Sequence, residues 1–280
     1  MTSGFEVVEG GLLTTVQDRG RPGYAHLGVP RAGALDQGAS ALANRLVGND
    51  DDCAVLETTL TGCALRARGT QVVAVTGAFA DVEVDGRRMP WGTRLVVPDG
   101  GVLRVGPAVH GARSLIAVAG GFAADVVLGS RSHDTLSGIG PPPLQSGALV
   151  PVGAPGATSV DDVVEVPFRP PARQIRLMPG PQTDWIDARE LSGTTWRVSS
   201  QSNRIGLRLE GSALVRRSGE VPSFGMVVGA VQLPPSGQPI VLLADHATTG
   251  GYPVIALVVL EDLDACAQWR PGDEITTHWR

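Results

Sequence analysis

The strongest constraint on this sequence is that its apolar residues come in short, β-branched runs interrupted by glycine, proline or aspartate. Runs of strand length lie at residues 72–75, 94–97, 114–118, 240–243 and 254–259. Runs this short and frequent, in a chain with 37 glycines and 21 prolines, are typical of barrels and sandwiches rather than of βαβ repeats. We therefore predict a mainly β fold.

A few helices are expected beside the strands. Asp36 can cap a segment whose apolar residues recur at helical spacing up to Leu46, and Gly48 follows it. Shorter helices are predicted at residues 184–191 and 262–269, each followed by a glycine or proline. These helices are too few to change the fold class.

The chain of 280 residues is long enough for one large domain or two small ones. A stretch rich in proline and glycine runs from residue 137 to 171, with a strand signal only around residues 163–166. Such a stretch indicates a loop between two halves. We therefore predict an N-terminal half at residues 1–170 and a C-terminal half at residues 171–280.

The basic residues exclude several function classes. The chain has no lysine, so all 23 of its positive charges are arginines. A Walker-A lysine, a Schiff-base lysine and a biotinylated lysine are therefore excluded on this chain. A net charge of −5 without a basic block argues against binding to nucleic acid.

Other classes are made improbable by the remaining patterns. No apolar stretch approaches 18 residues, and the first six residues lack a signal-peptide pattern, so we expect no membrane span and a cytoplasmic location. The three cysteines form no CxxC pair, and the five histidines show no ligand spacing. We therefore predict no disulfide framework and no metal site.

Polar clusters interrupt the apolar, glycine-rich background at three places. The first, residues 14–21, offers an amide, a carboxylate and two guanidinium groups in Gln17, Asp18, Arg19 and Arg21. Arginine is well suited to a bidentate grip on carboxylate or phosphate. The cluster fits an anion site, and it fits equally a surface turn held by a local Asp–Arg pair.

The second cluster, residues 199–206, places a run of polar side chains, including Ser202 and Asn203, before Arg204. Such a loop can present donors to an anion. Taken alone, it is more simply explained as an Asx or Ser/Thr turn between two strands.

The third cluster, residues 245–252, lies between two strand candidates and contains an aspartate, a histidine, two threonines and two glycines. A Gly-Gly pair is also a hairpin signal. We favour a site, because a simple turn does not need Asp245, His246 and two threonines. His246 is a candidate general base, although adjacent residues on a strand face opposite ways, so Asp245 is not predicted to form a dyad with it.

These clusters occur together, and in order, in a known family. The sequence resembles the biotin-dependent carboxyltransferase-like family, also called allophanate hydrolase subunit 2, over about residues 5–276. The motifs that carry the resemblance lie at residues 15–23, 33–36, 43–49, 56–59, 76–78, 129–132, 180–182, 202–209, 229–234 and 245–252. The sequence departs from the family pattern after residue 132, where His133 replaces a small hydroxyl residue.

The resemblance implies two interlocked halves, each built around a cyclophilin-like β-barrel. The family includes the KipA proteins and the C subunit of bacterial ATP-dependent 5-oxoprolinase. It therefore implies a hetero-oligomer with a KipI-like B subunit and a LamB/YcsF-like A subunit, which opens 5-oxo-L-proline to L-glutamate. ATP with Mg would be used by that complex, and no covalently bound cofactor is expected on this chain.

Two other functions stay open. One is a KipA-type regulatory protein that binds and antagonises a KipI-like kinase inhibitor. The other is a carboxyltransferase component that acts on urea or a similar amide, with the biotin carried by another chain.

The clusters and the resemblance together predict one composite site for a small anionic substrate. Asp18, Asp245 and His246 are the predicted catalytic residues. Residues predicted to bind the substrate or an anion are Gln17, Arg19, Arg21, Asn44, Glu57, Ser202, Asn203, Arg204, Gln232, Thr248, Thr249, Gly250, Gly251 and Tyr252. Glu57 and Gln232 enter this set because each interrupts an apolar, strand-like run.

Overall fold

The computed structural model describes residues 3–156 and 166–280 and divides into two compact units. Unit 1 consists of Met1–Arg21, Ala32–His133 and Gly138–Pro170, and unit 2 of Pro22–Arg31, Asp134–Ser137 and Pro171–Arg280. Two short segments of the first half thus belong to unit 2, which interlocks the halves along the chain. The strand signal expected at residues 163–166 lies, apart from Val166, outside the described residues.

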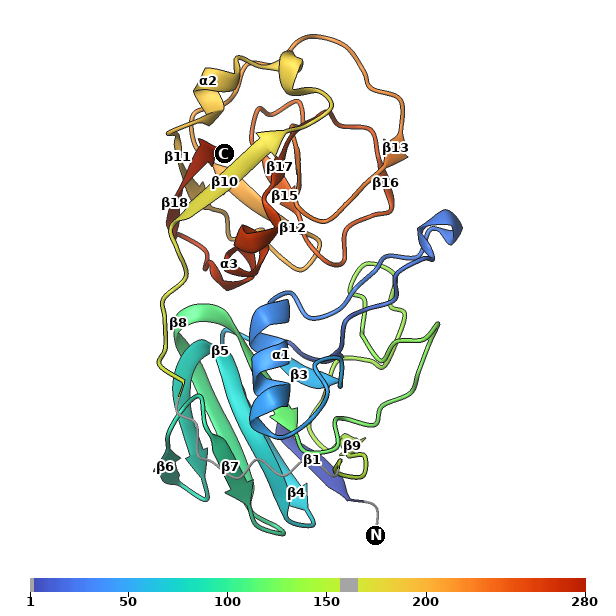
Figure 1. Cartoon of the computed structure of the whole chain (residues 1–280), viewed down its shortest axis with the longest axis vertical. Helices are drawn as coiled ribbons and strands as arrows, with labels where there is room; N and C mark the ends of the chain where they lie inside the picture. The colour runs from blue at the N-terminus through green and yellow to red at the C-terminus, as the bar shows by residue number, and fades with distance from the viewer. Residues whose placement is uncertain (1–2, 157–165) are drawn as a thin grey trace. The chain divides into compact units, whose positions relative to one another are not determined.

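Unit 1 is a nine-stranded antiparallel sheet. Its strands are β1 (Gly4–Glu9), β2 (Thr14–Gln17), β3 (Val55–Thr59), β4 (Cys63–Arg68), β5 (Gln71–Val84), β6 (Arg87–Met89), β7 (Arg94–Val97), β8 (Val102–Val118) and β9 (Leu149–Pro151). The two longest, β5 and β8, run side by side in Figure 1, and bulges between Gly77 and Val82 bend them. Because β8 also pairs with β3 and β4, the sheet curls around its own apolar core.

Helix α1 (Gln37–Leu46) packs against this sheet. The side chain of Asp36 accepts a hydrogen bond from Ala39 N at 2.8 Å, which confirms the predicted cap. The apolar face of helix α1, which includes Ala43, lies in one cluster with Ala74 of β5 and Leu115 of β8. The helix therefore covers the sheet near β3, where Glu57 lies.

Unit 2 contains a closed barrel of seven strands in the order β10-β17-β14-β15-β12-β11-β18. Their bounds are β10 (Gln174–Pro179), β11 (Thr195–Val198), β12 (Gly206–Glu210), β14 (Ala230–Gln232), β15 (Ile240–Leu242), β17 (Val254–Val258) and β18 (Glu274–Trp279). A parallel pairing of β10 with β18 closes the ring. Trp196 is fully buried, and its Nε1 donates to Thr277 Oγ1 at 3.1 Å.

Short elements decorate the barrel and the loops of unit 2. They are η1 (Ala25–Leu27), η2 (Thr183–Trp185), α2 (Ala188–Leu191), η3 (Leu260–Asp262), α3 (Leu263–Gln268) and the ribbon of β13 (Phe224–Gly225) with β16 (Thr249–Gly250). None of the helices among the described residues is long and apolar enough to cross a membrane.

The expected fold class is confirmed, and so is each of the predicted strand runs. The closed barrel lies in unit 2, whereas the sheet of unit 1 stays open. The helix predicted at residues 184–191 is instead two pieces, because Ile186 is extended and Asp187 starts α2 as a new cap. The helix predicted at 262–269 is α3, and the Asp262 carboxylate pairs with Arg176 at 2.7 Å instead of capping it.

The core of unit 1 generates a stability prediction. Ile116 is fully buried between β3 and β5, so Ile116→Ala should lower the free energy of unfolding of unit 1 by about 2–5 kcal/mol. Urea unfolding would measure it, with Val109→Ala, at a side chain 51% exposed, as the control. Equal losses in the two variants would contradict this account of the core.

Candidate functional site

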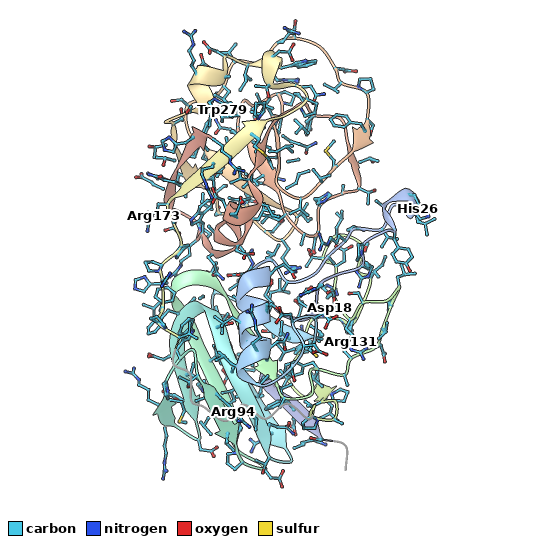
Figure 2. The ribbon with its side chains drawn as sticks, in the orientation of Figure 1. Asp18, His26, Arg94, Arg131, Arg173 and Trp279 are labelled. Atoms are coloured by element: carbon cyan, nitrogen blue, oxygen red, sulfur yellow. The ribbon has the colours of Figure 1, made fainter. Side chains whose placement is uncertain are left out.

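The Asp18 carboxylate collects donors from a distant segment of unit 1. It accepts hydrogen bonds from Ser130 Oγ, Ser132 Oγ and Arg131 N, each at 2.6 Å, and from Gly20 N at 2.7 Å. Figure 2 labels Asp18 and Arg131 where these segments meet. Because both carboxylate oxygens accept hydrogen bonds, Asp18 holds two loops together.

Arg21 and Gln17 lie beneath this cluster and are buried. Arg21 donates from Nε to Val127 O at 3.3 Å and from Nη2 to Ser132 O. Gln17 Nε2 donates to His133 O at 2.9 Å, while its Oε1 has no hydrogen-bond partner among the described residues. Gln17 is 0% exposed, so this acceptor lies buried inside unit 1.

The other predicted binding residues of unit 1 also contact the protein itself. Asn44 donates to Cys53 O at 2.8 Å, and Glu57 accepts from Leu35 N at 2.8 Å. Both side chains are buried. Arg19 differs, because its side chain is 58% exposed and, among the described residues, pairs only with Asp51, at 3.7 Å. Arg19 is therefore the arginine of the first cluster that remains open to an external anion.

A buried ion pair joins the second and third clusters in unit 2. Arg204 donates from Nε to Asp245 Oδ2 at 2.9 Å and from Nη2 to Asp245 Oδ1 at 3.1 Å. The two side chains are 2% and 0% exposed. Thr135 adds hydrogen bonds from its N at 2.9 Å and its Oγ1 at 2.7 Å to the same carboxylate. This arrangement fixes the loops but commits the Arg204 fork to the protein.

His246 is held in one tautomer by a contact with the main chain. Its Nδ1 lies 2.7 Å from Ala247 O, and since a carbonyl can only accept, Nδ1 carries the proton. The lone pair is then on Nε2. Burial lowers the pKa of His246 from its ordinary 6.5, and it outweighs the opposing effect of Asp245 and Asp134. The ring is therefore neutral near pH 7 and able to accept a proton.

The rest of the second cluster forms turns. Asn203 Oδ1 accepts from Ile205 N at 2.9 Å and from Gly206 N at 3.2 Å, which is an Asx turn. Ser202 Oγ accepts from Arg208 N at 3.0 Å. Both side chains therefore bond within their own loop, as expected of an Asx or Ser/Thr turn.

The third cluster is not a hairpin, because β15 and β17 both pair with β14. Thr249 and Gly250 form β16, and the Thr248 and Thr249 hydroxyls make no hydrogen bonds with the described residues. Tyr252 is 45% exposed, and Gly251 is exposed beside it. This loop of unit 2 therefore offers hydroxyl and backbone donors on the segment that also carries His246.

Gln232 lies at the base of this loop. It is 8% exposed, and its Nε2 donates to Met226 Sδ at 3.3 Å. A Cβ added at Gly250 would come within 2.6 Å of that Nε2. A side chain at position 250 would therefore displace the Gln232 amide from its place beside the ribbon.

Sequence reasoning missed Asp134 and Thr135. Asp134 is fully buried, accepts from Ser137 Oγ, and lies near His246. The signal was available, because residues 130–135 are an unbroken run of polar side chains comparable to the three recognised clusters. From the sequence alone the run is noticed only because part of it is a family motif. Nothing in the sequence shows that Asp245 needs the hydrogen-bond donors that the run supplies.

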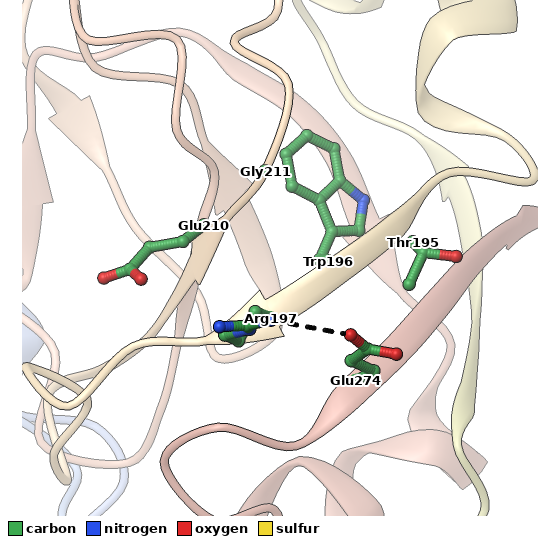
Figure 3. A pocket seen from close by; sticks show the side chains of 6 residues that line it. All are labelled: Thr195, Trp196, Arg197, Glu210, Gly211 and Glu274. Atoms are coloured by element: carbon green, nitrogen blue, oxygen red, sulfur yellow. Dashed lines mark ion pairs between the residues drawn. The ribbon is translucent and has the colours of Figure 1, made fainter.

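Two surface cavities are lined by none of these residues. One of about 340 Å³ in unit 2 is lined by Thr195, Trp196, Arg197, Glu210, Gly211 and Glu274. Figure 3 shows the Arg197–Glu274 ion pair across it, at 3.8 Å. Its charged groups are exposed, so it has the character of a solvated surface hollow.

Nucleophilic cysteine chemistry has no support. Cys63 and Cys266 are buried, and burial raises the pKa of Cys63 to about 12 and that of Cys266 further. Neither is a thiolate near pH 7. No group of three acidic, histidine or cysteine side chains suited to a metal occurs among the described residues.

Two of the three clusters are thus brought together, within unit 2. The first cluster belongs to unit 1, and its convergence with the other two on one substrate stays a prediction.

The tautomer and burial of His246 predict its titration. The ring should titrate below pH 6.5 in an NMR experiment, and Asp134→Asn should lower that pKa further by removing a nearby negative charge. Because the folded chain binds this proton less readily than the unfolded chain, stability should fall as the pH drops below about 6.5. Glu261→Gln is the control, and a titration above 6.5 would refute the assignment.

The donors around Asp18 predict a structural effect. Asp18→Asn replaces one acceptor with a donor that faces N–H or O–H groups, so unit 1 should lose about 2–4 kcal/mol of unfolding free energy. Denaturant unfolding measures this against Asp125→Asn, an exposed aspartate. Unchanged stability would show that Asp18 does not hold the loops.

Comparison with known proteins agrees with the fold. Residues 27–279 match the family model "Carboxyltransferase domain, subdomain A and B". The C subunit of the 5-oxoprolinase of Escherichia coli is 38% identical, over 97% of this chain and 89% of that protein.

Solved structures agree as well. The structure of TTHA0988 has a TM-score of 0.90 and 38% identity, and the match covers all of this chain but only 55% of that one. The K. lactis urea amidolyase has a TM-score of 0.87 at 26% identity, over 99% of this chain and 18% of that protein. The chain is a member of the carboxyltransferase-domain family with subdomains A and B.

Proposed function

We propose that this chain is the C-type subunit of an ATP-dependent 5-oxoprolinase complex, with a KipI-like B subunit and a LamB/YcsF-like A subunit, in the cytoplasm. The observation that carries the proposal is the likeness to the E. coli protein, which extends over nearly the full length of both chains. A likeness limited to one segment would support the fold alone.

The reaction opens a lactam. Water adds its oxygen to the ring carbonyl carbon, the C–N bond breaks, and a proton passes to the leaving nitrogen, which gives L-glutamate. His246 suits this chemistry, because its neutral Nε2 can take a proton from water and return it to the nitrogen. We assign the positioning of the water to the complete complex.

The substrate carries a carboxylate that needs donors. Thr248, Thr249 and the N–H of the exposed Gly251 are available on the loop that carries His246. Short polar donors of this kind can hold an anion close to a base without burying a second charge. We assign the substrate carboxylate to this loop.

The buried arginines of the predicted site are not available to a nucleotide. Arg21 donates to backbone carbonyls, Arg204 is paired with Asp245, and no metal-type cluster is present among the described residues. ATP and Mg are therefore assigned to the partner polypeptides, and no step that involves them is placed here. This makes the active site composite.

One specific observation favours a second function. The likeness to a urea amidolyase covers almost the whole of this chain. A carboxyltransferase role would need a biotin carrier on another polypeptide, because this chain has no lysine to biotinylate. ATP-dependent transfer of carboxyl to urea in a mixture with such a carrier would favour this alternative.

Reconstitution tests the proposal. The three subunits together should release glutamate from 5-oxoproline with ATP, and this chain alone should not. His246→Asn should lower kcat at least about 100-fold, since general base catalysis contributes that much. The matched control is His278→Asn, at a half-buried histidine of β18. Arg204→Ala is a poorer probe, because it strands the buried Asp245 charge.

The outcomes separate the candidates. No glutamate from the complete wild-type mixture would overturn the enzyme proposal. Binding to the KipI-like protein without turnover in any mixture would favour the regulatory role. Full activity of His246→Asn would leave the complex standing but remove the base from this loop.

A further inference from the structure

A tight turn in unit 1 exposes aliphatic side chains in a row. Val126, Val127 and Leu128 are 55%, 37% and 38% exposed. Single exposed aliphatic residues are ordinary, but a consecutive run at a turn is not, because turns favour polar residues and glycine. We call residues 126–129 the apolar turn.

The backbone of the apolar turn is strained. Leu128 and Gly129 have φ values of 52° and 79°, and two main-chain hydrogen bonds close the turn between Val127 and Ser130. This is the φ signature of a type I′ turn, whose first central position favours asparagine, aspartate or glycine.

Another turn of the chain follows that preference. The turn between β5 and β6 uses Asp85 and Gly86, with φ values of 51° and 74°. Leu128 breaks the rule, although its side chain gains little burial in return. A strained residue that the fold does not need is a reason to look for a function.

The apolar turn is nevertheless held rigidly. Asp18 accepts from Ser130 Oγ and from Arg131 N, and the Arg131 guanidinium donates to Ala124 O at 2.9 Å. A Cβ added at Gly129 would meet nothing within 4 Å, so the tip stands clear of its surroundings. A rigid knob loses little conformational entropy when it docks.

From exposure, strain and rigidity together, we infer that the apolar turn is a docking knob that inserts into an apolar pocket on a second, different polypeptide. The inference rests on the proposed function, which makes the KipI-like B subunit that polypeptide. The relatives agree with an additional polypeptide, because one is named a subunit and the TTHA0988 chain extends well beyond the matched region.

Two other occupants fit less well. A second copy of this chain would have to accept the knob in a pocket of its own, such as the cavity of about 380 Å³ lined by Phe5, Leu149 and Val150. That contact would be head-to-tail and would propagate into rings or filaments. A lipid surface is disfavoured, because the exposed Asp125 at the base of the turn is repelled by anionic headgroups.

Calorimetric titration of the KipI-like B subunit into this chain tests the inference. Leu128→Gly and Val126→Thr should each weaken association at least tenfold. Leu128→Gly should leave the thermal midpoint unchanged or raise it, since glycine relieves the left-handed strain. The matched control, Val96→Thr, alters an equally exposed valine of β7, 56% exposed, and should bind like the wild type.

Several results would overturn the knob. Undiminished association of both variants with the B subunit would do so. So would variants whose only defect is a loss of self-association in sedimentation, or a loss of binding to phosphatidylserine vesicles. A wild-type chain that never binds the B subunit would contradict the partner assigned above as well. A wild-type complex that survives both substitutions would overturn the docking surface alone, whatever the glutamate assay shows.

Discussion

The fold removes the carboxylates of Asp18 and Asp245 wholly or partly from water. The polar residues around them therefore serve as their hydrogen-bond donors. A buried or half-buried carboxylate has to be met by donors, or the fold loses several kcal/mol. Asp18 is met by hydroxyl and backbone groups more than 110 residues away, and Asp245 by Arg204 and Thr135. In each unit, loops that are remote along the chain are thereby fixed around one charge.

This constraint explains why the sequence predicted the clusters better than their roles. Polar runs with arginine have the composition of a ligand site, and the same composition satisfies a buried carboxylate. Arg204 and Asp245 are 41 residues apart, and no local pattern indicates that they pair. His246 stays a predicted base, chosen because a simple turn does not need a histidine at that place.

The fold was more accessible to prediction than the site. Runs such as residues 114–118 form strands because β-branched side chains suit a pleated, buried surface, and Asp36 caps α1 through a contact three residues away. Signals of this kind depend on residues that are close together in the sequence, so the sequence alone contains them. The break at Ile186 was missed, because it depends on the barrel into which η2 packs rather than on helix propensity.

Arg21 and Arg204 are engaged by groups of the protein itself, which limits what the chain can do alone. Opening an unstrained lactam requires a base and a way to activate the carbonyl. In the proposed function the base is His246, whose pKa is lowered by burial against the opposing effects of the Ala247 carbonyl, Asp245 and Asp134. For the second, Arg204 is already neutralised by Asp245, and Arg21 is turned toward carbonyls. The proposed function therefore assigns activation of the carbonyl to another polypeptide of the complex.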